Sequence, residues 1–147
     1  MSLADWEKNG WIKAHSTSRE EIASLLGVVD RDLSDSQTRG LSADWKLSIA
    51  YNAALQAATA ALAAAGYRAG RDAHHYRVIQ SLQLTVAPES NWVDQLEKFR
   101  KKRNIGGYER AGAVSDKEAR EMIHLAQQLS AAVKKWLTKK YPKYFKQ

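Results

Sequence analysis

Apolar residues recur at spacings of three and four along most of the chain, which is the period of an amphipathic α-helix. One stripe runs from Ile22 through Leu26 to Val29, and a longer one runs from Ala119 to Trp136. Only two prolines interrupt the chain. The pattern predicts an all-α protein.

Capping residues divide the chain into helices. The segments SREE (18–21) and SDKE (115–118) match the capping box, in which the first and last side chains satisfy free backbone N–H groups at a helix start. Ser42 is the expected N-cap of a long helix that ends near Gly66. We expect helices over residues 4–14, 18–39, 42–65, 74–83, 90–105 and 115–137, with a turn at residues 66–70.

Four long helices and two short ones, joined by short connections, predict an up-and-down four-helix bundle with one or two additional short helices. The 147 residues fit one domain, 1–147, with a short N-terminal helix in 1–16 and a basic aromatic tail in 138–147. The helix over 42–65 is apolar nearly all round, so we expect it at the centre. Its narrow polar row faces a polar network or a cleft and consists of Ser48, Asn52, Gln56 and Thr59.

Composition narrows the function. Without cysteine, the chain has no disulfides and no thiol-ligated metal. It has no leader pattern, and no uninterrupted apolar run reaches the length of a membrane span, so we expect a cytoplasmic protein without membrane contacts. Residues 1–66 hold six basic and eight acidic side chains, whereas residues 67–147 hold 17 and eight. An anionic partner would therefore dock on the second half.

The most basic segment is KFRKKRNIGGYER, residues 98–110. At 100° per residue, Arg103 falls within about 40° of Trp92, on the face that also carries Leu96 and Phe99. The three lysines of the segment point to the other side, where they stay hydrated. An inward guanidinium needs a carboxylate, carbonyl groups, a cleft or a subunit interface to offset its desolvation.

Two interpretations of Arg103 follow. In the first, it forms a buried ion pair with an acid of the first half. In the second, it lines a functional cleft, where Arg100 and Asn104 join it to bind one anion. The Gly-Gly pair that follows allows the chain to turn, which would bring Tyr108 back toward Arg103.

An all-α chain with a helix ending in Arg-Asn, followed by a short spacer and then His or Tyr, resembles the HEPN domain superfamily. The resemblance covers most of the chain, in the segments LSADWKLSIAYNAALQAATAAL, HHYRVIQSL, FRKKRNIGGYERAG and VSDKEAREM. It implies a helical bundle that forms a homodimer with the motif at a cleft along the interface. It also implies binding of RNA or a nucleotide in a toxin–antitoxin, defence or RNA-processing system, with an antitoxin or another protein as partner.

The same resemblance implies roles for single residues. Arg103 matches the arginine of the motif and Asn104 its polar residue, whereas Tyr108 stands where the histidine is expected. These three are the candidate catalytic residues, and with Arg100 and Arg110 they form the candidate binding set. A tyrosine with a pKa of about 10 is a poor proton acceptor near pH 7. The sequence therefore favours binding over metal-independent ribonuclease activity.

Histidines elsewhere could supply the missing imidazole. His74 and His75 open a helix, where a capping or gap-filling role is favoured, and His124 lies off the apolar stripe. Glu121 with His124, and Asp72 with His75, have the spacing of half a di-metal site, which requires further carboxylates on facing helices. We expect neither a metal nor a cofactor.

Two alternatives remain open. The protein could be a non-enzymatic dimeric interaction module in which Arg103 is a buried ion pair. Residues 134–146 mix lysines with aromatic residues and could grip single-stranded nucleic acid. Because Trp136 and Leu137 continue the core stripe, packing of this tail on the bundle is favoured.

Overall fold

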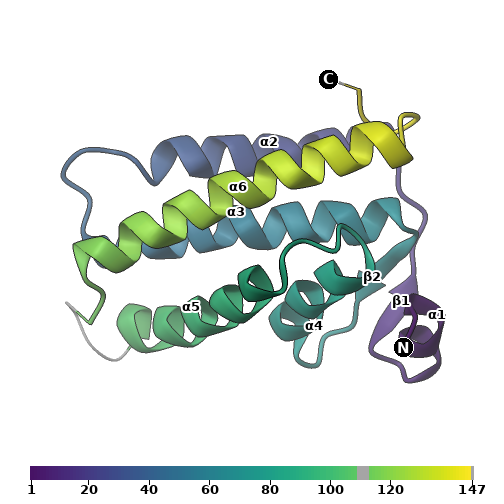
Figure 1. Ribbon diagram of the computed structural model, residues 1–147, viewed down its shortest axis with the longest axis horizontal. Coiled ribbons are helices and arrows are strands. Elements are labelled where there is room, and N and C mark those ends of the chain that lie inside the picture. Colours follow the sequence, from purple (N-terminus) through teal and green to yellow (C-terminus); the bar gives the residue numbers. More distant parts are fainter. Residues whose placement is uncertain (109–112, 147) are drawn as a thin grey trace.

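The computed structural model describes residues 1–108 and 113–146, and of residues 90 and 104–108 it describes the backbone alone. The chain is mostly helical, as predicted (Figure 1). Its elements are α1 (Leu3–Lys8), β1 (Ile12–Ala14), α2 (Arg19–Asp35), α3 (Ala43–Ala64), β2 (Tyr67–Ala69), α4 (His74–Ser81), the 3-10 turn η1 (Leu82–Leu84), α5 (Ser90–Tyr108) and α6 (Asp116–Lys140).

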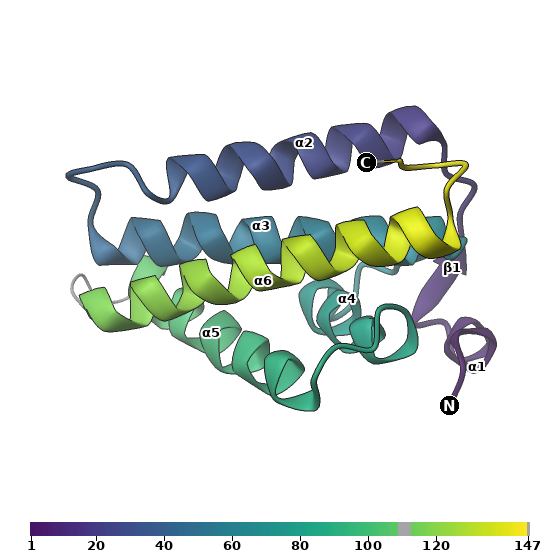
Figure 2. The same cartoon turned by 45° about the horizontal axis from the view of Figure 1, so that its top comes forward.

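Helix α3 is the centre of the fold. It packs against α2, α6, α5 and α4, which surround it, as Figure 1 and Figure 2 show from two directions. Of its 22 side chains, 13 are buried, and nine of these are alanines, which let the neighbouring helices approach closely. Among the described helices, α3 alone is long and apolar enough to cross a membrane, and most of it is buried inside the protein.

The predicted caps of two long helices are confirmed. The Ser42 hydroxyl accepts a hydrogen bond from the Trp45 backbone N–H at 3.2 Å, which starts α3. At α6, Ser115 and Glu118 form the complete capping box. The predicted stripe of α6 is buried from Ala119 to Val133, and Trp136 is half-buried.

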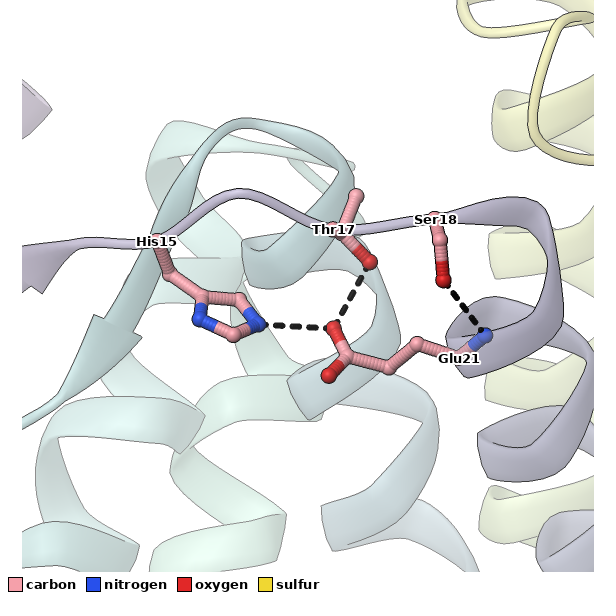
Figure 3. A network of polar contacts seen from close by, with 4 residues as sticks. All are labelled: His15, Thr17, Ser18 and Glu21. Carbon is pink, nitrogen blue, oxygen red and sulfur yellow. Dashed lines mark hydrogen bonds and ion pairs between the residues drawn. The ribbon is translucent and has the colours of Figure 1, made fainter.

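The capping box expected at α2 is only half formed. The Ser18 hydroxyl accepts from the Glu21 N–H at 3.1 Å, but the Glu21 carboxylate does not return to the N-cap. Instead, its Oε1 accepts from the Thr17 hydroxyl and lies against His15 Nε2, both at 2.7 Å (Figure 3). This helix also ends at Asp35, earlier than expected.

The predicted N-terminal helix over residues 4–14 is wrong beyond Lys8. Gly10 adopts a φ of 76°, a left-handed conformation that interrupts the helix, and residues 12–14 form β1. The expected turn at 66–70 is wrong too, because its central residues form β2. The two strands pair antiparallel with Ile12 opposite Ala69, and Ile12 is buried in a small second core cluster with Trp6 and Leu62.

The basic aromatic tail packs on the bundle, as favoured. Helix α6 continues to Lys140, and the Trp136 and Tyr141 rings meet edge to face, 5.2 Å apart. Tyr141 stacks in turn on Tyr144, and both contact the main core with Phe145. The aromatic rings of this segment therefore close the end of the core.

Candidate anion-binding site

Arg103 lies on the core side of α5, as the helical period predicted. It follows the buried Leu96 and Phe99 on that face and is itself half-buried. Its guanidinium carbon is 5.4 Å from the centre of the Tyr51 ring of α3. Its Nε is buried and has no hydrogen-bond partner among the described residues.

The buried ion pair considered for Arg103 does not form with any carboxylate in the part of the chain that the structure describes. The Tyr51 ring stabilises the cation from one side, by about 0.5–2 kcal/mol in general. A buried donor without a partner costs about 1–3 kcal/mol. Arg103 is thus held in place while part of its hydrogen-bonding capacity is unused.

Arg100, one turn earlier on α5, is partly committed to Glu97. Its Nε lies 3.0 Å and its Nη2 3.0 Å from Glu97 Oε2, and both side chains are mostly covered. A guanidinium carries five N–H groups, so this pairing leaves donors for another acceptor. The Glu97 carboxylate also offsets part of the positive charge beside Arg103.

Tyr51 forms the floor of the cluster. Its side chain is 1% exposed, and its hydroxyl is buried without a hydrogen-bond partner among the described residues. Burial raises the pKa of Tyr51, and the opposing effect of the Arg100 and Arg103 charges is smaller. The phenol therefore stays protonated and remains a hydrogen-bond donor.

His75 of α4 packs on the same ring. The centres of the His75 and Tyr51 rings are 6.1 Å apart, with 47° between the ring planes. Burial lowers the pKa of the half-buried His75, and the positive charges of Arg103, His74 and Arg100 lower it further. His75 is therefore neutral near pH 7.

The neighbouring His74 has a different environment. It is exposed, and its Nδ1 donates to the Gly70 carbonyl at 3.2 Å. The capping role considered for the two histidines is not observed, because the N-cap residue of α4 is Ala73 and receives no side-chain hydrogen bond. His75 instead fills a position between three helices.

We call Tyr51, His75, Arg100 and Arg103 the arginine site. Two of its members, Arg100 and Arg103, belong to the predicted set. The backbone of α5 stays helical through the Gly-Gly pair to Tyr108, so the turn that this pair would allow is not observed. A continuous helix instead places position 108 about 140° around the axis from position 103.

The remaining predicted residues lie outside the described part. This applies to the side chains of Asn104 and Tyr108 and to the whole of Arg110. Tyr51 was not among the predicted site residues, and His75 was considered as a substitute imidazole but was not placed in the predicted set. One signal was available for Tyr51: it is a phenol within a nearly continuous apolar helix, where a polar atom requires an explanation.

The lysines beside the site behave differently from one another. Lys98 and Lys101 are exposed, as predicted. Lys102 is half-buried, and its Nζ lies 3.5 Å from Glu118 Oε2, which links α5 to the start of α6. The prediction of a fully hydrated side chain is therefore wrong for Lys102.

Two cavities lined by described residues lie along α6. One, of about 340 Å³, lies between α5 and α6 and includes Glu121 and His124. The other, of about 490 Å³, lies between α2, α3 and α6 and is also lined by the exposed His124. Within the described residues, His, Asp and Glu side chains form no cluster of three that could hold a metal ion.

Comparisons of this chain with protein-family models, with curated proteins and with solved structures gave no match to any of them.

Proposed function

We propose that the arginine site binds a phosphate group of RNA or of a nucleotide. The observation that carries the proposal is Arg103, a half-buried guanidinium that lies on the Tyr51 ring with a buried, unpaired Nε. Guanidinium groups match phosphate geometry and form charge-assisted hydrogen bonds with it. The Arg100 and Arg103 charges both act on the Tyr51 hydroxyl, which stays protonated and can donate a hydrogen bond.

Charge favours a polyanion over an isolated small anion. Residues 67–147 carry 17 basic and eight acidic side chains, and this half contains α4, α5 and α6. Each nucleotide adds a negative charge, so contacts beyond the arginine site would add affinity that falls as salt rises. We therefore place RNA ahead of a mononucleotide as ligand.

The resemblance to HEPN domains belongs to the same proposal. In it, α2, α3, α5 and α6 form an up-and-down bundle, and two copies of the chain form a homodimer with the Arg-Asn segment near the interface. The protein would act in the cytoplasm within a toxin–antitoxin, defence or RNA-processing system, alone or with an antitoxin partner. Because Tyr108 replaces the motif histidine, binding is favoured over metal-independent ribonuclease activity.

The test is RNA binding by Arg103→Ala, measured by fluorescence anisotropy with a labelled single-stranded oligonucleotide between about 50 and 200 mM salt. We expect the affinity to fall by about tenfold or more, the effect of losing a charged hydrogen-bonding group. Lys101→Ala, an exposed cation on the same helix, is the matched control and should weaken binding only slightly.

Two outcomes would contradict the proposal. An Arg103→Ala variant with the affinity of the wild type would remove Arg103 from the site. If neither RNA nor a mononucleotide binds the wild-type protein, the non-enzymatic interaction module becomes the better description. Competition by a mononucleotide at the wild-type site would indicate a nucleotide instead of RNA as ligand.

A further inference from the structure

His75 extends the arginine site onto a third helix. The Tyr51 ring of α3 contacts both the His75 ring of α4, at 6.1 Å between ring centres, and the Arg103 guanidinium of α5, at 5.4 Å. The buried hydroxyl of this ring has no described partner. An imidazole and a guanidinium therefore both lie close to one phenol ring.

We infer that His75 takes up one proton when a phosphodiester binds at Arg103, so that the site binds RNA more tightly as the pH falls. This inference rests on the proposed function and deepens it. His75 would then supply the imidazole that is absent from the Arg-Asn segment. It would become a charged hydrogen-bond donor when the anion binds.

The charges that face His75 explain why it is neutral in the empty site. Arg100 and Arg103 face it from α5, Tyr51 faces it from α3, and His74 precedes it on α4, with 5.9 Å between the two imidazole centres. Among the described residues, the acidic side chain that acts on this cluster is Glu97, which is paired with Arg100.

The other elements packed against α4 add little charge near this ring. The 3-10 turn η1 has no titratable side chain, and the arginine of β2, Arg68, is exposed. The positive charges of α5 and the partial burial of the ring are therefore the main influences on His75, and both lower its pKa.

A bound phosphate would reverse part of this balance. Its negative charge would offset the Arg100 and Arg103 charges, and its oxygens would accept a hydrogen bond from the protonated ring, so the pKa of His75 should rise on binding. The direction of the pH dependence follows from linkage. If the pKa of His75 is higher in the complex than in the free protein, binding becomes stronger as the pH falls from the pKa of the complex to the pKa of the free protein. For one proton, the affinity changes by at most about tenfold per pH unit.

The ligand for the test should not titrate in this range. A single-stranded RNA oligonucleotide without terminal phosphates contains only phosphodiesters, whereas a phosphate monoester has a second pKa of about 6. Tyr51 does not interfere, because its raised pKa keeps it protonated. His75 is then the member of the arginine site that can change its charge near neutral pH.

The experiment measures the affinity of wild type, His75→Gln and His74→Gln for this oligonucleotide between about pH 6 and pH 8. Calorimetry in two buffers of different ionisation enthalpy counts the protons taken up. We expect wild type and His74→Gln to gain affinity severalfold over the range, with net proton uptake. In His75→Gln, most of this gain and the uptake should be lost. His74 is a suitable control because it is adjacent, exposed and engaged with Gly70.

A second readout avoids dependence on the variant. The NMR titration of the His75 ring in the wild-type protein should move to higher pH when RNA is added. An unmoved titration, or a His75→Gln variant that folds and keeps the full pH dependence, would overturn the inference. Binding that still requires Arg103 would then leave the proposed function standing, whereas absence of RNA binding at every pH would overturn both.

Discussion

Tyr51 and Asn52 are neighbours on α3, yet their side chains enter polar surroundings of opposite kinds. Asn52 donates to Asp32 of α2 at 2.7 Å, and Asp32 is only 5% exposed. Arg31 completes this cluster by donating from Nε to Asp32 at 3.0 Å, and Gln56 donates to Asn52. We call Arg31, Asp32, Asn52 and Gln56 the α2–α3 network.

The arginine site, on the other side of the same helix, is incompletely paired. The Tyr51 hydroxyl and Arg103 Nε are both buried without described partners. Buried polar groups in folded proteins are nearly always hydrogen-bonded, and exceptions concentrate where a ligand or function requires them. Both clusters contain a buried side chain, so burial alone does not distinguish the α2–α3 network from a candidate binding site. The buried donors without described partners occur in the arginine site.

The largest expected effect comes from breaking the α2–α3 network. Asp32→Ala removes the acceptor of Asn52 and leaves a partly buried amide unpaired, which should lower the free energy of unfolding by about 1–3 kcal/mol. Urea denaturation measures it. Asp30→Ala is the control on the same helix: Asp30 also forms an ion pair, with Lys134 at 2.7 Å, but is exposed, so its loss should cost less than about 1 kcal/mol. Equal costs would mean that the network is no more stabilising than a surface pair.

A smaller effect, of opposite sign, is expected at the arginine site. Tyr51→Phe removes a buried hydroxyl that has no described partner, so the free energy of unfolding should stay constant or rise by up to about 1 kcal/mol. RNA affinity should fall about two- to tenfold, because a donor to the phosphate is lost. Thermal melting and anisotropy provide the two measurements, and Tyr76→Phe, at an exposed phenol, should change neither. A destabilised Tyr51→Phe would show that the hydroxyl has a partner in the free protein.

The smallest effect concerns Glu21, whose carboxylate is well paired but more accessible to solvent. The Thr17 hydroxyl, and next His15, hold the pKa of Glu21 below its ordinary 4.5. A carboxylate whose pKa is lower in the folded than in the unfolded state stabilises the fold at pH values above its unfolded pKa. This stabilisation disappears as the pH falls through its folded pKa.

Glu21→Gln should therefore lower the melting temperature slightly near neutral pH, by the equivalent of less than about 1 kcal/mol, and the difference should shrink as the pH falls below the ordinary pKa of 4.5. Glu20→Gln, in the same turn, is the control. If the two variants show the same pH profile, the paired carboxylate contributes nothing beyond its charge. That result would mean that pairing of a polar group affects the stability of this protein only where the group is buried.

The sequence predicted the helices well where local signals are strong. Ser42 and Ser115 mark helix starts because capping acts within one turn, and the position of Arg103 follows from a period that needs no knowledge of the partner helices. The strands were missed for the opposite reason. Three residues at Ile12–Ala14 are too few to show a period of two, and they are ordered by residues Tyr67–Ala69, far along the chain.

The candidate site was only partly predictable. Arg100 and Arg103 lie on one helix, so their spacing shows that they are close. Tyr51 and His75 reach them from two other helices, and no spacing in the sequence encodes that meeting. Tyr51 also carries an apolar ring on an apolar helix, so the hydrophobic pattern predicts a core residue. Its buried hydroxyl without a described hydrogen-bond partner distinguishes it from the other core residues of this helix.

The pairing of β1 with β2 has a consequence for the order in which this half of the molecule is completed during synthesis. Residues 12–14 leave the ribosome before α3 and residues 67–69, so they have no strand to pair with until these have followed. The Trp6 and Trp11 rings must also wait, since Leu62 and the Arg77 guanidinium, which lies 3.8 Å from the centre of the Trp11 ring, come later in the chain. Trp6, Trp11 and β1 are thus fixed in place only after residues 62–77 have been made, and a nascent chain that stalls within α3 would present two uncovered tryptophans to chaperones.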